Sequence, residues 1–205
     1  MVFQRKRLAE RISLVFSAPT ITAIAVLSFA FLSPLQFGPL LNWLSGLVIG
    51  IFLIGLLPII PIILEVKKGN IDINVSERTM RPKFLIQAIV LSFISGLIFF
   101  SLQAVDLMVL SFAYSAVTLS ILIVSLYWKI SIHAAGIAGP LTAIAYILGW
   151  PFILLFIILL PVGWARVELD AHNVKQFLAG TGLAVLITLM VYMFFSLFSI
   201  SLGPL

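Results

Sequence analysis

Seven apolar runs, each near the length of a bilayer-spanning helix, divide this 205-residue chain. A helix rises about 1.5 Å per residue, so roughly 20 apolar residues cross the hydrocarbon core of a bilayer. The expected helices cover residues 12–32, 40–65, 84–103, 106–128, 131–148, 151–166 and 174–200. Charged residues make up only 9% of the chain and the mean hydropathy is +1.26, which excludes an ordinary soluble domain. We therefore expect an all-α, polytopic transmembrane helical bundle that forms a single domain over residues 1–205.

Prolines and polar residues mark the breaks between these runs. Pro58 and Pro61 fall inside the second run, where a missing backbone N–H kinks a helix or ends it early. The apolar stretch from 84 to 128 must fold back once, and we expect that turn at Gln103–Asp106. Pro151 suits the first turn of the sixth helix. No small-residue cleavage site follows the first run, so we interpret that run as a retained helix and not as a signal peptide.

The basic residues are all expected on one face of the membrane. They lie at the N-terminus and around the connections that follow the second, fourth and sixth helices, which return to the side of the N-terminus. The twelve are Arg5, Lys6, Arg7, Arg11, Lys67, Lys68, Arg78, Arg81, Lys83, Lys129, Arg166 and Lys175. The opposite face carries Asp106 as its only charge. Because lysine and arginine in short loops mark the cytoplasmic side, we expect the N-terminus and this basic face in the cytoplasm.

Three polar stretches meet on the basic face: NIDINVSERTMRPK, WKISIHAAG and ARVELDAHNVKQFLAG. They hold eight candidate site residues, namely Arg78, Arg81, Lys129, Ser131, His133, Arg166, His172 and Gln176. Guanidinium and ammonium groups bind phosphoryl oxygens. A serine that caps a helix adds backbone N–H groups that attract anions. The pattern therefore indicates phosphate handling, with the cations and Ser131 as phosphate ligands.

Both histidines of the chain lie on this face. One imidazole can attack phosphorus while the other protonates the leaving oxygen. His172 and Gln176 are four residues apart and share a helix face, so the Gln176 amide oxygen is expected to accept one ring N–H of His172. The other ring nitrogen is then free to attack. We interpret Glu168 and Asp170 as residues that hydrate the loop or balance Arg166.

These residues resemble the three-part signature of the type-2 phosphatidic acid phosphatase superfamily. Arg81-Pro82 is similar to the end of K-x6-RP, Ser131-x-His133 to PSGH, and Arg166-x5-His172-x3-Gln176 to SR-x5-H-x3-D. The third part is the most specific, because its arginine and histidine stand at the family spacing. Their order and placement at one membrane face agree with the family over roughly residues 70–185.

The resemblance implies a membrane-embedded phosphatase with a six-helix core that acts without a metal or another cofactor. It makes His172 the nucleophile, which forms a phosphohistidine, and His133 the general acid. It assigns phosphate binding to Arg81, Arg166 and Ser131. A site at the bilayer level favours a lipid phosphate or an isoprenoid diphosphate whose tail stays in lipid. The sequence does not choose among polyprenyl diphosphate, phosphatidic acid, phosphatidylglycerophosphate-like lipids and a soluble ester, and no nucleic-acid partner is expected.

The chain departs from the family pattern at several positions. Asn74 replaces the lysine, Ile130 and Ile132 replace the proline and glycine of the second motif, Ala165 replaces a serine, and Gln176 replaces the aspartate. Arg78 or Lys129 can supply the missing cation. An amide keeps the hydrogen bond to histidine but gives up stabilisation of the imidazolium, which predicts a slow enzyme or a non-catalytic relative.

The competing interpretation is a transporter or scaffold whose basic face binds anionic lipid headgroups without chemistry. Transport favours functional polar groups near the bilayer midplane, whereas the ionisable residues here gather at one face. That distribution favours the enzyme. The oligomeric state stays open.

Overall fold

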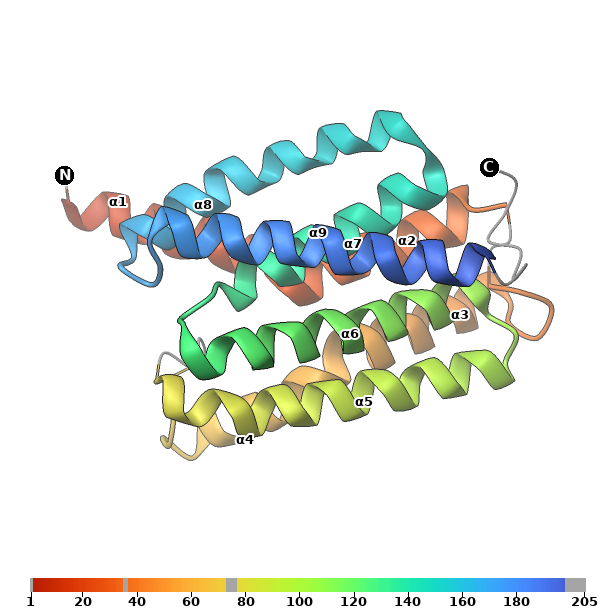
Figure 1. The fold of residues 1–205 in the computed structure, drawn as a ribbon, viewed down its shortest axis with the longest axis horizontal. Helices are drawn as coiled ribbons and strands as arrows, with labels where there is room; N and C mark the ends of the chain where they lie inside the picture. The colour runs from red at the N-terminus through yellow and green to blue at the C-terminus, as the bar shows by residue number, and fades with distance from the viewer. Residues whose placement is uncertain (1, 35–36, 73–76, 198–205) are drawn as a thin grey trace.

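The computed structural model describes residues 2–34, 37–72 and 77–197, and their regular secondary structure is entirely helical. Long helical segments run back and forth along one axis (Figure 1). Six are long and apolar enough to cross a membrane: Gln4–Leu32, Trp43–Lys67, Arg81–Ser101, Val105–Tyr127, Trp150–Glu168 and Val174–Leu197. The seventh is α7 (Ile132–Leu148), an apolar helix of 17 residues. The expected transmembrane bundle of about seven helices is confirmed.

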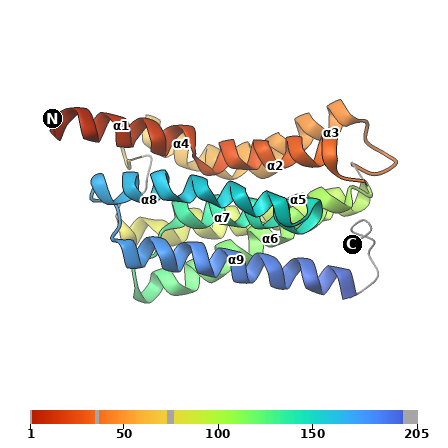
Figure 2. The ribbon, with the colours of Figure 1, turned by 90° about the horizontal axis from the view of Figure 1, so that it is seen from above.

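The first span consists of two helices, α1 (Val2–Val15) and α2 (Ala18–Leu32). Ser17 is the N-cap of α2 and Pro19 lies in its first turn, where a missing N–H has no helical partner to lose. The expected start at residue 12 is wrong, because the charged N-terminal residues are helical as well. They carry α1 past the ends of the neighbouring helices (Figure 2).

The second span changes helix type along its length. It consists of α3 (Trp43–Gly50), a π-helical stretch (Ile51–Leu56), a 3-10 turn (Leu57–Ile59) and α4 (Ile60–Lys67). The sequence predicted that Pro58 and Pro61 would disturb this helix, and the disturbance is a local change in the hydrogen-bond pattern. The helical path continues past both prolines and does not end early.

Helices α5 (Arg81–Ser101) and α6 (Val105–Tyr127) pack against each other as an antiparallel hairpin. α5 begins at Arg81, with a proline in its first turn. It is followed by Gln103, whose φ of 56° is left-handed. A left-handed residue just after a helix reverses the chain direction. The turn therefore lies where the sequence predicted it.

The last part of the chain forms α7, a 3-10 helix (Trp150–Ile158), α8 (Leu159–Glu168) and α9 (Val174–Leu197). Gly149 ends α7 with a φ of 100°, which a residue without Cβ adopts at little cost. The 3-10 stretch replaces the first half of the α-helix expected over 151–166. Pro161 contributes to this difference, because it has no N–H to donate to the Ile157 carbonyl.

The two ends of the bundle differ in charge. One end of the bundle holds the start of α1 together with the α4–α5, α6–α7 and α8–α9 connections, as both views show (Figures 1 and 2). All twelve lysines and arginines belong to these segments or to the helix turns beside them. Asp106, in the first turn of α6, lies at the opposite end. The fold thus produces the single basic face that the sequence predicted, and we refer to it as the basic end.

Helices α7 and α9 pack closely through small residues, as membrane helices commonly do. A Cβ added at Gly180 would lie 2.4 Å from the Ser131 carbonyl oxygen. Next to this contact the Ser131 N–H donates to the Gln176 carbonyl at 3.2 Å. Eight residues further along both helices, a Cβ at Gly139 would lie 3.4 Å from Oγ1 of Thr188. The starts of the two helices are therefore held together by backbone contacts.

We expect the Gly180→Ala substitution to destabilise the protein, because its methyl group meets a carbonyl that no rotamer change can move. Overpacking of this kind costs about 1–3 kcal/mol. The matched control is Gly182→Ala in the same helix, where an added Cβ meets nothing within 4 Å. The measurement is the thermal unfolding midpoint in detergent, which should fall for Gly180→Ala only. Equal midpoints for both variants would show that α9 does not approach α7 this closely.

Candidate active site

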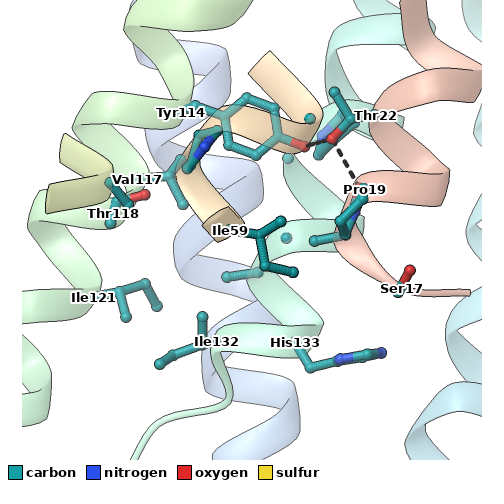
Figure 3. Close-up of a pocket in the computed structure, with 18 of the residues that line it drawn as sticks. Ser17, Pro19, Thr22, Ile59, Tyr114, Val117, Thr118, Ile121, Ile132 and His133 are labelled. Atoms are coloured by element: carbon teal, nitrogen blue, oxygen red, sulfur yellow. Dashed lines mark hydrogen bonds between the residues drawn. The ribbon is translucent and has the colours of Figure 1, made fainter. Parts of the chain in front are cut away.

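A cavity of about 520 Å³ runs into the bundle from the basic end, and residues of α1, α2, the second half of the second span and α5 to α9 border it. Its wall is mostly apolar, and Figure 3 shows His133 at one end of it and Tyr114 with Thr22 at the other. Four of the predicted site residues line it: Arg81, His133, Arg166 and His172. Residues that are far apart in the sequence thus face one space.

The spacing between Arg166 and His172 follows from the way α8 ends. Asp170, with a φ of 53°, takes the left-handed position of a helix C-terminal motif. The Asp170 N–H donates to the Val167 carbonyl at 3.0 Å, and the Ala171 N–H donates to the Arg166 carbonyl at 3.1 Å. The His172 N–H donates to the same Arg166 carbonyl at 3.2 Å. With a spacing of six residues, the turn after α8 therefore brings the backbone of His172 back to that of Arg166.

The next helix begins with a reciprocal cap. The Asn173 Oδ1 accepts from the Gln176 N–H at 2.9 Å, and the Gln176 Oε1 accepts from the Asn173 N–H at 3.2 Å. This arrangement is a capping box, in which two side chains satisfy two helix-end donors. The same Gln176 Oε1 lies 3.2 Å from Nδ1 of His172. The predicted contact between His172 and Gln176 is present. Because the amide oxygen accepts, Nδ1 carries the ring proton and Nε2 is the free base.

Both arginines of the cavity are buried and held by named contacts. Arg81 is 2% exposed, and its Nη1 donates to the Ile130 carbonyl at 3.4 Å. Arg166 is 4% exposed, and its Nη1 donates to Oγ of Ser13 at 3.0 Å. Buried arginines need hydrogen-bond acceptors or anions around them, because an isolated charge is costly outside water. The pair therefore forms a fixed, electropositive wall.

His133 stands in the first turn of α7, and Ser131 is its N-cap. The Ser131 Oγ accepts from the Ala134 N–H at 3.2 Å, as the sequence predicted. Ser131 is fully buried and does not line the cavity, so its side chain serves the helix start and does not face this space. The Nε2 of His133 is buried without a hydrogen-bond partner among the described residues.

The remaining predicted residues lie around this centre. Lys129 is half-buried in the connection before α7. Arg78 begins a 3-10 turn just before α5, and its side chain falls outside the described part of the chain. Asn74 also falls outside the described residues. Glu168 and Asp170, interpreted as residues that hydrate the loop or balance Arg166, lie in the turn that ends α8. Glu168 pairs with Arg5 at 3.1 Å, and Asp170 pairs with Lys6 at 3.7 Å.

Sequence reasoning missed the part that α1 plays. Ser13 bonds Arg166, and Glu10 also lines the cavity. The two ion pairs of Arg5 and Lys6 hold α1 against the end of α8. The basic N-terminal residues predicted only topology, and nothing in their spacing points to α8.

The electrostatics favour a neutral His172. Burial lowers the pKa of His172 to about 4, the hydrogen bond with Gln176 acts in the opposite direction, and the charges of Arg166, Arg81 and Lys129 lower it further. Burial also lowers the pKa of Lys129, and Arg81 and Arg166 act in the same direction. A histidine whose pKa is depressed keeps an unprotonated nitrogen at neutral pH, which a nucleophile requires.

We expect the His172 ring to stay neutral from about pH 8 down to about pH 5, whereas an exposed histidine protonates near pH 6.5. In a His133→Gln background the remaining imidazole gives one set of NMR signals, which should not shift over that range. Lys129→Met should raise the His172 pKa, because it removes a positive charge. Lys175→Met, at an exposed position, is the matched control and should leave it unchanged. A midpoint near pH 6.5 would show that the ring is solvated.

Comparison of the chain with protein-family models, curated proteins and solved structures found no match. The chain is a multi-pass membrane protein, as its apolar spans show.

Proposed function

We propose that the chain is a membrane-embedded phosphatase that hydrolyses a lipid phosphate or diphosphate through a phosphohistidine. The observation that carries the proposal is the cavity itself. Two histidines and two buried arginines line one end of a space whose remaining wall is mostly apolar. A polar end for a phosphoryl group and an apolar remainder for a tail match an amphiphilic substrate. The resemblance to the type-2 phosphatidic acid phosphatase signature supports the same assignment.

In the proposed mechanism Arg81 and Arg166 bind the phosphoryl oxygens and neutralise the charge that grows in the transition state. Nε2 of His172 attacks phosphorus, so that a P–N bond forms while the bond to the leaving oxygen breaks. His133 begins the cycle as the imidazolium and gives that oxygen a proton from Nε2, the buried nitrogen without a described partner. A water then attacks the phosphohistidine, His133 takes a proton from it, and phosphate leaves with His172 restored.

Gln176 is the positioning residue of this scheme. Its amide oxygen fixes the His172 tautomer and simultaneously closes the capping box with Asn173. An aspartate at this position would also stabilise the imidazolium through its negative charge. A glutamine orients the His172 ring without that stabilisation, so we expect a lower rate of hydrolysis. In this scheme the arginines and the helix starts neutralise the charge of the phosphoryl group, so the proposed reaction uses no metal ion.

The second candidate function is headgroup binding without turnover. The capping box favours it, because it explains the presence of Gln176 without catalysis. The depressed pKa of His172 favours the enzyme, because a purely electrostatic anion site gains nothing from a neutral imidazole.

We expect the two histidines to fail in different ways. His172→Ala should trap no acid-labile phosphate on the protein during turnover of a labelled lipid phosphate. His133→Ala should still trap it, but should turn over alkyl phosphates about 10²–10⁴-fold more slowly, because they need protonation of the leaving oxygen. An aryl phosphate, with its good leaving group, should lose much less. Undiminished trapping in His172→Ala would remove that residue from the nucleophile role.

The proposal also places the site at the cytoplasmic surface, since the basic end holds both the site and all twelve lysines and arginines. The chain has no cysteine, so single cysteines test this directly. Leu40→Cys, at an exposed position of the opposite end, should react with an impermeant maleimide in intact cells. Asn70→Cys, exposed at the basic end, should react only after permeabilisation. The reverse pattern would invert the orientation.

A further inference from the structure

The cavity does not become entirely apolar below the phosphate end. Polar side chains also line the wall toward the middle of the bundle, among them Thr22, Tyr114 and Thr188. Figure 3 shows Tyr114 and Thr22 in contact on the side of the cavity away from His133. We refer to these three residues as the deep polar band.

The depth of this band follows from the packing of α7 and α9. Ser131 contacts Gly180 at the start of the two helices, and Gly139 faces Thr188 eight residues further along each. Eight residues of helix correspond to about 12 Å. The band therefore lies one to two helical turns below His133. If the phosphate of a substrate lies between the arginines, the first atoms of its tail lie beside the deep polar band.

The hydrogen-bonding groups of the deep polar band are only partly satisfied. Thr22 donates its proton to the Ala18 carbonyl at 2.8 Å, so the 2.5 Å contact between Thr22 and Tyr114 has the tyrosine as donor. Thr188 is 1% exposed, and its Oγ1 has no partner among the described residues. Pro140 has no N–H for the carbonyl of Gly136, which also lines the cavity. Thr188 thus offers a free donor at a depth where an unsatisfied polar group is costly.

We infer that the deep polar band recognises a hydrogen-bonding linkage next to the phosphate of the substrate, an ester carbonyl or a hydroxyl, with Thr188 as the donor or acceptor. This inference rests on the proposed function and narrows its substrate class. Glycerol-based lipid phosphates carry such groups one glycerol backbone away from the phosphate. Polyprenyl phosphates carry only carbon and hydrogen there. The band therefore selects glycerolipid phosphates over isoprenoid ones.

A site built to hydrogen-bond its ligand discriminates against an analogue that lacks the group, because the buried protein atom is then left unpaired. One such bond corresponds to about a tenfold difference in kcat/KM. Thr188→Val removes the hydroxyl and keeps the shape of the side chain. It should therefore remove the preference for lipids that carry an ester or a hydroxyl.

The test compares three lipid monophosphates with the purified full chain in detergent: a diacyl phosphatidic acid with esters, an ether-linked lysophosphatidic acid with a hydroxyl and no ester, and hexadecyl phosphate with neither. Wild type should prefer one of the first two over hexadecyl phosphate by about tenfold, and Thr188→Val should lose that preference. The lipid whose advantage disappears identifies the group that Thr188 contacts. Farnesyl phosphate should behave as hexadecyl phosphate does.

The matched control is Thr181→Val, because Thr181 lies on the same helix, has a buried hydroxyl without a described partner and does not line the cavity. It should leave the preference unchanged. Equal rates of wild type on all four lipids, or an equal loss on all four in Thr188→Val, would overturn the inference while leaving phosphatase activity standing. Should wild type release phosphate from none of them, the proposed function fails. The inference is then decided by the thermal shift that each lipid produces: Thr188→Val should lose the larger shift with the preferred lipid, and Thr181→Val should keep it.

Discussion

The first turn of α9 is fastened to the start of α7 by backbone contacts, and the geometry of the candidate site depends on this junction. The Ser131 N–H donates to the Gln176 carbonyl, and Gly180 leaves room for the Ser131 carbonyl. One histidine belongs to each partner of the junction, since His133 follows Ser131 and His172 precedes Gln176. Backbone hydrogen bonds in a lipid environment are hard to exchange for water. The two helix starts beside which the imidazoles lie are therefore held together by backbone contacts.

A second consequence of the same region is that structural and chemical duties fall on the same side chains. Gln176 caps a helix and orients a histidine, and Arg166 closes α8 with its carbonyl while its guanidinium lines the cavity. Ser13 anchors that guanidinium from the N-terminal helix. Such sharing keeps polar groups satisfied at a membrane face where few other partners exist. It also means that a substitution in the site changes helix ends as well as chemistry.

Much of this arrangement was predictable, and the parts that were not have a common physical reason. Run lengths and charge gave the spans and the basic end, and local spacing gave the Ser131 cap and the contact of His172 with Gln176. The bond from Arg166 to Ser13 and the position of Thr188 in the cavity depend on which helix faces meet. In a soluble helix an apolar stripe marks the buried face, but a helix that is apolar all round carries no such mark. The break between α1 and α2 was missed because the charged residues before it were interpreted only as a topology signal.

The 3-10 stretch at the start of the sixth span has a consequence for length. A 3-10 helix rises about 2.0 Å per residue against about 1.5 Å in an α-helix. The nine residues Trp150–Ile158 and the ten residues of α8 together reach about 33 Å, where a regular α-helix of the same 19 residues would reach about 28 Å. The hydrocarbon core is about 30 Å thick. Stretching the helix thus lets the shortest of the six long spans cross the same bilayer as α9, with its 24 residues, and still deliver Arg166 to the membrane surface.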